Sequence, residues 1–329
     1  MKRIIAIVAG GDSSEHEVSL RSAQGIYSFI DKNKYACYII VITGTRWEAM
    51  LSDGSKTPVD KNDFSFETPD GRVRPDFAYI TIHGTPGENG ILQGYFDLIR
   101  LPYSTSGVLV EALTFNKFSL NQYLKAWGVR VAESVLLRKG QEDAVSDEDI
   151  IEKVGLPCFV KPNADGSSFG VTKVKTKDQL RPAIEKAMGE GSETMIETFI
   201  SGTEVTCGCY KTKNRQRIFP ITEVVTEQEF FDYEAKYNGA SQEITPARIA
   251  ESTAQRVSQL TSAIYDILGC EGIIRVDYIL SGEPGEEKIN LLEVNTTPGM
   301  TPASFIPQQV RAAGLTMAEV LEDIIENKF

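Results

Sequence analysis

The chain has 329 residues and a formal net charge of −12, from 34 lysines and arginines against 46 aspartates and glutamates. This acidic balance argues against nucleic acid as a partner, because nucleic-acid-binding proteins rely on basic surfaces. The composition is that of a soluble globular protein, and the length suggests roughly two or three domains. No stretch approaches the ~20 apolar residues of a membrane span, so we expect a cytoplasmic protein without a membrane partner. The five cysteines lack zinc-ligand spacing and are expected to be reduced packing residues.

The first hundred residues alternate between strand and helix patterns. Strand patterns cover residues 4–9, 38–42 and 77–82, and helices are expected from about Glu17 and after Gly90. This alternation predicts a parallel α/β layer. The polar stretch 52–75 has no clear period and predicts a surface connection.

Two candidate site residues follow strands of this layer. The segment GGDSSEHE at 10–17 opens a helix, and Ser14 with Glu17 has the spacing of a capping box, so Glu15 is left as a candidate to bind a cationic group. His83 ends a strand at the sheet edge where α/β proteins build sites. The glycine spacing is not G-x-G-x-x-G, so an NAD-linked enzyme is the weaker alternative.

The next segment carries a lysine within an apolar pattern. Leu113, Lys117, Leu120, Leu124 and Trp127 predict one face of a single helix that stops at Gly128. Lys117 either extends its ammonium group to solvent or directs it at a buried phosphate, and the pattern alone leaves both open.

A glycine and serine loop, KPNADGSSFG at 161–170, lies between two predicted strands. Its lysine, Lys161, ends the first strand, and Ser167 and Ser168 add hydroxyl donors to backbone N–H groups that can converge on an anion. The loop turns back into a strand instead of opening a helix, so it is not a P-loop. An ordinary hairpin loop is the alternative interpretation.

The most informative pattern is a hairpin with strands at 275–280 and 289–295. Because side chains alternate across a strand, Arg275 and Asp277 share one face, and Glu293 and Asn295 share one face. Asp277, Glu293 and Asn295 offer only oxygen ligands, which suits magnesium near a phosphate. A solvated strand face remains the alternative.

A charged aromatic loop at 230–237 is a candidate lid, or else a plain surface loop.

Together these segments resemble the D-alanine-D-alanine ligase family of the ATP-grasp superfamily, in order and over nearly the whole chain. The segments that carry the resemblance are GGDSSEHEVSLRSA at 10–23, HGTPGENGILQG at 83–94, PYSTSG at 102–107, VKPNADGSSFGV at 160–171, FFDYEAKY at 230–237, RVD at 275–277 and LLEVNTTPGMTPASF at 291–305. Each is weak alone, but the ordered set is specific.

The resemblance implies an ATP-grasp fold, of α/β and α+β class, preceded by a parallel α/β N-terminal domain. The three domains expected are 1–115 for substrate binding, 116–196 as the central subdomain, and 197–329 with the lid and the magnesium site. The implied activity is ATP-dependent ligation of two D-alanine molecules through a D-alanyl phosphate, for peptidoglycan precursors. Joining D-alanine to D-serine or D-lactate is the alternative, and a nucleotide-binding regulator without turnover is a third.

The resemblance also implies a role for each matching residue. Glu15 would hold the first ammonium group, His83 would stand near its carboxylate, and Ser304 would receive the second carboxylate. Arg275 and the N–H of Gly299 would face the oxyanion, and Tyr237 would join Ser167 and Glu15 in a hydrogen-bonded latch. Phe305 stands where many members carry leucine, which leaves the tolerance of the second-substrate site open.

For the nucleotide, the resemblance places ATP between the central and C-terminal domains. The residues implied to contact it are Lys117, Lys161, Ser168 and Lys236 at the phosphates, Glu197, Phe199 and Ile200 at adenine, and Glu204 at the ribose. Asp277, Glu293 and Asn295 would bind two Mg²⁺ ions, for which Mn²⁺ can substitute. Members of the family are commonly homodimers, which we also expect here.

Overall fold

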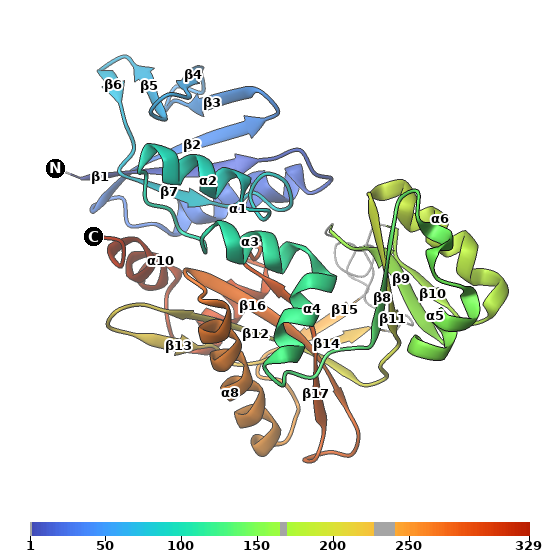
Figure 1. The fold of residues 1–329 in the computed structure, drawn as a ribbon. Coiled ribbons are helices and arrows are strands. Elements are labelled where there is room, and N and C mark those ends of the chain that lie inside the picture. Colours follow the sequence, from blue (N-terminus) through green and yellow to red (C-terminus); the bar gives the residue numbers. More distant parts are fainter. Residues whose placement is uncertain (1, 165–169, 227–240) are drawn as a thin grey trace.

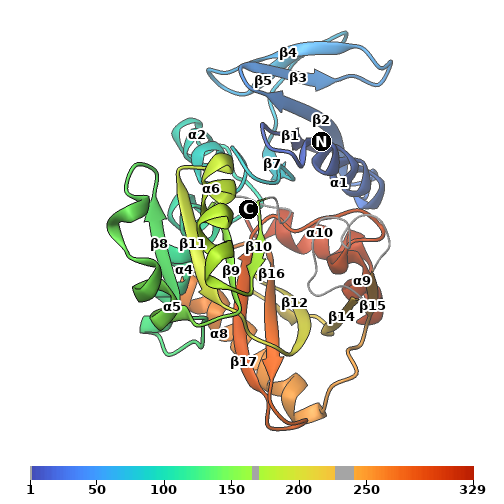
Figure 2. The same ribbon diagram turned by 90° about the vertical axis from the view of Figure 1, so that its right-hand side faces the viewer.

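The computed structural model describes residues 2–164, 170–226 and 241–329. Within these residues the chain forms three β-sheets covered by helices (Figures 1 and 2). The sheets span residues 3–80, 134–198 and 203–295. The expected domain boundaries at 115/116 and 196/197 stay a prediction, and the second of them falls inside a strand. No helix among the described residues is both long and apolar enough to cross a membrane.

The first sheet has a parallel centre and an antiparallel extension. Its strands, in spatial order, are β6 (Gly71–Val73), β5 (Ser65–Thr68), β4 (Lys56–Asp60), β3 (Arg46–Met50), β2 (Tyr35–Thr43), β1 (Arg3–Gly10) and β7 (Phe77–Ile80). Only β2, β1 and β7 pair in parallel. The continuous apolar run of β1 is explained by its burial on both faces, under helices such as α1 (His16–Phe29) and α2 (Ile91–Ile99).

Two predictions for this region were wrong. Residues 52–75 are not a simple surface connection, because they contain β4, β5 and β6. These strands are too short to show a period, but Phe64 and Phe66 are fully buried there. The capping box of Ser14 and Glu17 does not form: α1 begins at His16, and no side chain caps it.

The single helix expected around Lys117 is two helices, α3 (Val108–Phe115) and α4 (Lys117–Ala126). Asn116 between them has an extended backbone, and its side chain accepts from the Ser119 N–H as an N-cap. Asparagine favours this capping role, which outweighs the continuous apolar stripe. Trp127 does not share the buried face, since 60% of it is exposed.

The second and third sheets are antiparallel. The second has the order β10 (Thr172–Val174), β9 (Cys158–Pro162), β11 (Glu193–Thr198) and β8 (Ser134–Arg138), with α5 (Asp147–Val154) and α6 (Leu180–Glu190) packed on it. The third has the order β15 (Ser241–Ile244), β14 (Thr222–Thr226), β12 (Thr203–Lys211), β16 (Ile273–Ser281) and β17 (Lys288–Asn295), with β13 (Gln216–Ile218) paired to β12 and α8 (Glu251–Leu268) against it. Short 3₁₀ turns lie at Glu142–Ala144 and Lys177–Gln179.

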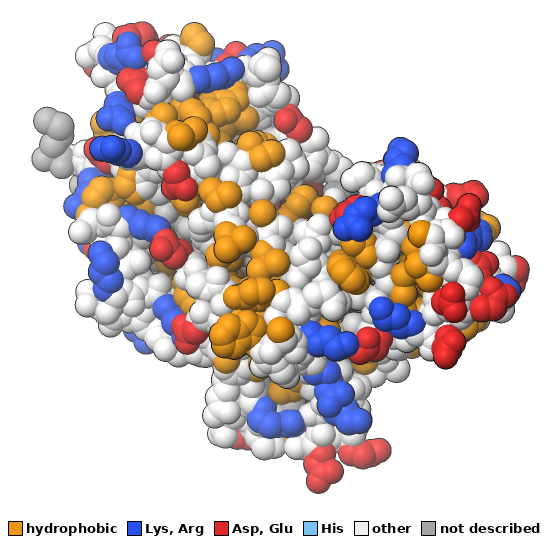
Figure 3. Space-filling model, in the orientation of Figure 1, with side chains coloured by type: hydrophobic (Ala, Val, Ile, Leu, Met, Phe, Trp, Pro, Cys, Tyr) orange, Lys and Arg blue, Asp and Glu red, His pale blue; other side chains and the backbone are white. Residues whose placement is uncertain are grey.

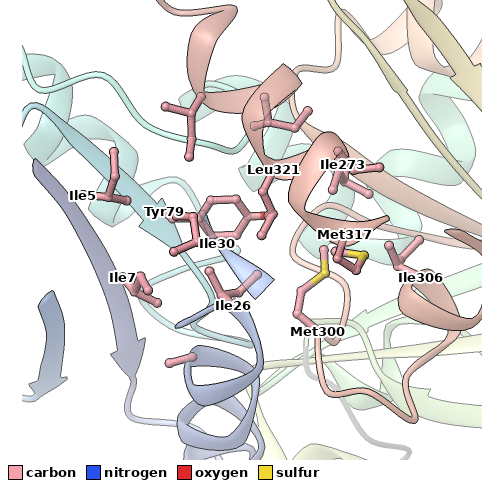
Figure 4. Close-up of a cluster of buried hydrophobic side chains, with 14 of the residues drawn as sticks. Ile5, Ile7, Ile26, Ile30, Tyr79, Ile273, Met300, Ile306, Met317 and Leu321 are labelled. Carbon is pink, nitrogen blue, oxygen red and sulfur yellow. The ribbon is translucent and has the colours of Figure 1, made fainter. Parts of the chain in front are cut away.

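The chain end returns to the first sheet through α9 (Phe305–Ala312) and α10 (Met317–Glu326). Figure 4 shows Met300, Met317 and Leu321 facing Ile26 and other side chains of the N-terminal region. All of them belong to one buried apolar cluster. The N-terminal sheet and the C-terminal segment therefore share a core, which fixes the loops at the end of β1 against residues 296–304.

Candidate active site

One cavity of about 820 Å³ gathers every predicted site residue that the structure describes. Its lining includes Glu15, His83, Lys117, Lys161, Glu197, Phe199, Ile200, Glu204, Arg275, Asp277, Glu293, Asn295, Gly299 and Ser304. Ser167, Ser168, Lys236 and Tyr237 lie outside the described residues.

The β16–β17 hairpin brings its four polar residues together by strand register. Arg275 is opposite Asn295, and Asp277 is opposite Glu293. The Arg275 guanidinium donates twice to Asp277, from Nε at 2.9 Å and from Nη2 at 2.7 Å. Asn295 Nδ2 donates to Asp277 Oδ2 at 3.1 Å and to Glu293 Oε1 at 3.5 Å. The face predicted from alternation therefore exists and lines the cavity.

The donor set of this face fits magnesium. Asp277, Glu293 and Asn295 carry carboxylate and amide oxygens, the ligand types that hard divalent cations prefer. Asp277 is only 5% exposed, and the Thr206 hydroxyl orients it with a hydrogen bond to Oδ1 at 2.5 Å. Among the described residues, no group of three histidines, cysteines, aspartates or glutamates is placed to hold a metal ion.

Two lysines reach the cavity from β9 and α4. Lys161 is buried, and its Nζ lies 2.5 Å from Glu197 Oε1 across the strand pair β9–β11. Lys117 is the first residue of α4, and its N–H donates to the carbonyl of Asn163, just past β9. Asn163 Oδ1 also accepts from the Phe118 N–H at 2.8 Å. The end of β9 therefore positions both lysines on the same wall.

The connection from β11 to β12 supplies an aromatic wall. The Phe199 ring meets Phe159 edge-on at 5.7 Å between centroids, and Lys173 Nζ lies 3.8 Å from the Phe199 centroid. Ile200 follows directly, and Glu204 lies at the start of β12 on the same cavity. This arrangement is able to hold a planar base next to a polar group.

At the opposite end of the cavity, the N-terminal sheet contributes Glu15 and His83. Glu15 is the residue before α1, and its N–H donates to Ser13 Oγ at 3.2 Å. His83 is buried, and its Nε2 lies 3.3 Å from Ser22 Oγ. The Ser13 hydroxyl donates to the His83 carbonyl at 2.7 Å, which ties the two segments together.

Gly299 and Ser304 stand on the segment between β17 and α9. A Cβ atom on Gly299 would lie 2.9 Å from Ser304 Oγ, so a side chain at this position would displace the serine hydroxyl. Ser304 Oγ accepts from the Thr301 N–H at 3.1 Å, which fixes the serine before α9. The Phe305 ring centroid lies 5.2 Å from the Arg275 guanidinium carbon, so Phe305 packs beside the hairpin cation.

Three acids that line the cavity were not predicted from the sequence: Glu88, Glu223, which is paired with Arg248, and Glu243. Loss of solvation raises the pKa of Glu88, and the nearby His83 opposes this while Glu15 adds to it. Loss of solvation also raises the pKa of Glu243, opposed by its hydrogen bond from Gln308 and by the charge of Arg275. Glu88 lies in the segment HGTPGENG, so its sequence signal was present, whereas Glu243 has none.

The two antiparallel sheets and the cavity between them, with lysines on one wall and a carboxylate hairpin on the other, define an ATP-grasp enzyme. Residues 4–106 match the family model described as D-ala D-ala ligase N-terminus, and residues 123–326 match the D-ala D-ala ligase C-terminus. The chain is 69% identical to the D-alanine-D-alanine ligase of Phocaeicola vulgatus over 100% of both chains.

Solved structures agree with these matches. The VanG D-Ala:D-Ser ligase from Enterococcus faecalis is 31% identical over 100% of both chains, with a TM-score of 0.88. The D-alanine-D-alanine ligase from Bacillus anthracis complexed with ATP is 29% identical, with a TM-score of 0.77 over 99% of this chain and 97% of that one. The chain belongs to the D-alanine-D-alanine ligase family and is an ATP-dependent ligase.

Proposed function

We propose that this cavity joins two D-alanine molecules to D-alanyl-D-alanine at the expense of ATP, as a supply step for peptidoglycan precursors. The first carboxylate attacks the γ-phosphorus of ATP, so that ADP leaves and a D-alanyl phosphate forms. The amine of the second D-alanine then attacks the acyl carbon. The tetrahedral intermediate expels inorganic phosphate and the amine loses a proton, which leaves a peptide bond.

The residues at the N-terminal end bind the amino acids. Glu15 pairs with the first ammonium group, and His83 stands beside the first carboxylate. Ser304 receives the second carboxylate from the start of α9. The Arg275 guanidinium and the Gly299 N–H face the oxyanion that develops, and such preorganised donors contribute about 3 kcal/mol each.

The opposite end binds ATP. Phe199 and Ile200 enclose the adenine next to Glu197, Glu204 takes the ribose hydroxyls, and Lys117 and Lys161 hold the phosphates. Asp277, Glu293 and Asn295 would hold Mg²⁺, which neutralises phosphate charge when bound. Ser167, Ser168, Lys236 and Tyr237 complete the proposal as phosphate and latch residues.

The observation that carries this proposal is the shared cavity. Residues from the second and third sheets, from the loops that follow β1 and β7, and from the segment 296–304 line it, although their positions in the chain run from Glu15 to Phe305. The lysines and the oxygen-bearing hairpin face one space, while Glu15 and His83 close its far end. The carboxylate of Glu15 can bind an ammonium group at one end, and the lysines can bind phosphates at the other. The cavity therefore suits two amino acids beside the phosphates of a nucleotide.

The experiment is D-alanine-dependent release of ADP. Purified protein with MgCl₂ and ATP should release ADP far faster with D-alanine than with L-alanine, and mass spectrometry should identify D-alanyl-D-alanine. A rate that does not respond to D-alanine would contradict the proposal. With D-alanine, D-serine and D-lactate present together, the main product should still be D-alanyl-D-alanine, in line with the 69% identity to a ligase named for D-alanine.

We also place the reaction in the cytoplasm, where ATP is made and thiols stay reduced. All five cysteines are free, which suits that compartment.

A homodimer is supported by an apolar surface on α2 and α3, where Ile91, Leu98, Val108 and Leu109 are exposed. Figure 3 shows orange side chains running down this face. Sedimentation analysis should give a dimer, and L98E/L109E should give a monomer.

A further inference from the structure

Glu88 joins the N-terminal sheet to the segment that follows β17. Its Oε1 accepts from the Thr297 hydroxyl at 2.6 Å, and its Oε2 accepts from the Gly84 N–H at 2.7 Å. Each carboxylate oxygen therefore accepts a hydrogen bond, one from the segment after β17 and one from the N-terminal region. The Thr297 hydroxyl also lies 3.3 Å from the Ile82 carbonyl, at the end of the same N-terminal segment.

A second tether lies three residues further along. The Met300 N–H donates to Ser22 Oγ at 3.3 Å, and Ser22 Oγ is also 3.3 Å from His83 Nε2. Ser22 is fully buried in α1, so its position is fixed by the packing of that helix. One side chain of α1 therefore contacts both His83 and the residue after Gly299.

Gly299 lies between these two tethers. Thr297 is held by its hydroxyl, Pro298 has a fixed φ because of its ring, and Met300 is held by its N–H. We propose that Glu88 is a positioning residue that sets the Gly299 N–H against His83 across the junction between the N-terminal sheet and the C-terminal segment. This inference rests on the proposed function, in which Gly299 faces the oxyanion.

The neighbouring threonine offers a matched control. The Thr296 hydroxyl donates to Glu111 Oε2 at 2.6 Å, so two adjacent threonines each bond a carboxylate from the N-terminal part of the chain. Glu111 is fully buried and is absent from the cavity lining. Its Oε1 has no hydrogen-bond partner within the described part of the chain, whereas both oxygens of Glu88 have one.

Because of this difference, substitution by glutamine should have different effects at Glu88 and at Glu111. In E88Q the amide oxygen can still accept from the Gly84 N–H, but the NH₂ group then faces the Thr297 hydroxyl, which has to change from donor to acceptor. The strong hydroxyl–carboxylate hydrogen bond is therefore replaced by a weaker one between neutral groups. In E111Q the NH₂ group takes the place of an oxygen without a partner, and the amide oxygen still accepts from Thr296. A general structural role for acids at this junction would affect both variants alike.

The test measures steady-state kinetics of ADP release with D-alanine, together with melting temperatures. We expect E88Q and T297V to lower kcat about 10- to 100-fold, since small displacements of reacting groups have effects of this size. T297S should restore kcat to within about threefold because it keeps the hydroxyl, and the KM for ATP should stay at the wild-type value. E111Q should keep the wild-type kcat.

The double variant E88Q/T297V adds a coupling measurement. If the two residues act through one contact, the double variant should be no slower than the slower single variant. Wild-type kcat in both E88Q and T297V would overturn the inference, as would an equal loss in E111Q. Absence of D-alanine-dependent ADP release in the wild-type enzyme would instead contradict the proposed function, so the two failures are distinguishable.

Discussion

The β16–β17 hairpin and the segment 296–304 are consecutive in the chain, yet they hold their functional groups by different means. In the hairpin, strand register places Asp277 opposite Glu293 and Arg275 opposite Asn295. In the following segment no ladder exists, and Gly299 is positioned between contacts to Glu88 and Ser22, more than 200 residues away in sequence.

The two regions differ in how far the positions of their functional groups depend on distant parts of the chain. Register is local, so the hairpin can lose one side chain and keep the others in place. The segment depends on long-range hydrogen bonds, so a change in the N-terminal sheet reaches Gly299. Variants in the hairpin should therefore affect chemistry without affecting the fold, whereas variants at the junction should affect geometry.

The largest expected effect is that of D277A. Loss of this carboxylate removes an oxygen ligand and the partner of Arg275, so kcat should fall by at least about 10³-fold. The hairpin backbone and its apolar face remain, and circular dichroism should match that of the wild type. E283A, an acid-to-alanine change on the exposed turn of the same hairpin, should keep full activity. Unfolding of D277A would show that the hairpin depends on this side chain for its fold as well as for its chemistry.

Strand register on β9 and β11 also holds the pair Lys161–Glu197, but here the loss of one partner should affect stability as well as ATP binding. Both side chains are at most 10% exposed, so K161M leaves a buried carboxylate without its cation. We expect a loss of about 3–5 kcal/mol in unfolding free energy, measured by urea denaturation. K161M/E197Q should recover most of the stability but not the affinity for ATP. Equal stability of K161M and wild type would contradict the pairing.

In the segment 296–304, the substitution G299A should disturb the backbone. Its Cβ would lie 2.9 Å from Ser304 Oγ, so either the backbone or the serine must move. We expect kcat/KM for D-alanine to fall about 10²-fold with little change in the KM for ATP. G299A/S304A removes the clash, so at saturating D-alanine its kcat should exceed that of G299A, while its KM for D-alanine should rise because Ser304 no longer receives the second carboxylate. Wild-type kinetics in G299A would show that the segment is not held tightly.

The smallest effect concerns pH. Loss of solvation raises the pKa of Glu111 well above its ordinary value of 4.5, and the hydrogen bond from Thr296 opposes this only in part. Its contribution to stability is therefore fully present below pH 4.5 and is lost as pH rises through the folded-state pKa. E111Q stays neutral, so its melting temperature should equal that of the wild type near pH 4 and exceed it at pH 8. A constant difference across this range would contradict the assignment.

Patterns of short range could be predicted from the sequence. Alternation gave the shared faces of Arg275 with Asp277 and of Glu293 with Asn295, and the structure confirms that all four line one cavity. The capping box of Thr316 and Glu319 at the start of α10 depends on a pattern of equally short range. The family resemblance supplied what patterns could not, including the placement of Glu15 and His83 at the same site.

The rest depended on tertiary contacts. The chain breaks between α3 and α4 because the Asn116 side chain caps α4, although the apolar pattern would fit one continuous helix. The strands in 52–75 are stabilised by pairing with their neighbours, which leaves little trace in composition. The contacts of Glu88 and Glu111 with adjacent threonines connect sequence positions 209 and 185 residues apart, and no periodicity records them.

A crystal structure of the protein with MgCl₂ and a nonhydrolysable ATP analogue would test whether the hairpin binds magnesium beside the nucleotide. We predict magnesium bound by Asp277, Glu293 and Asn295 and in contact with the phosphates, with the base beside Phe199. Those three side chains in bulk solvent, with the nucleotide phosphates elsewhere, would contradict it.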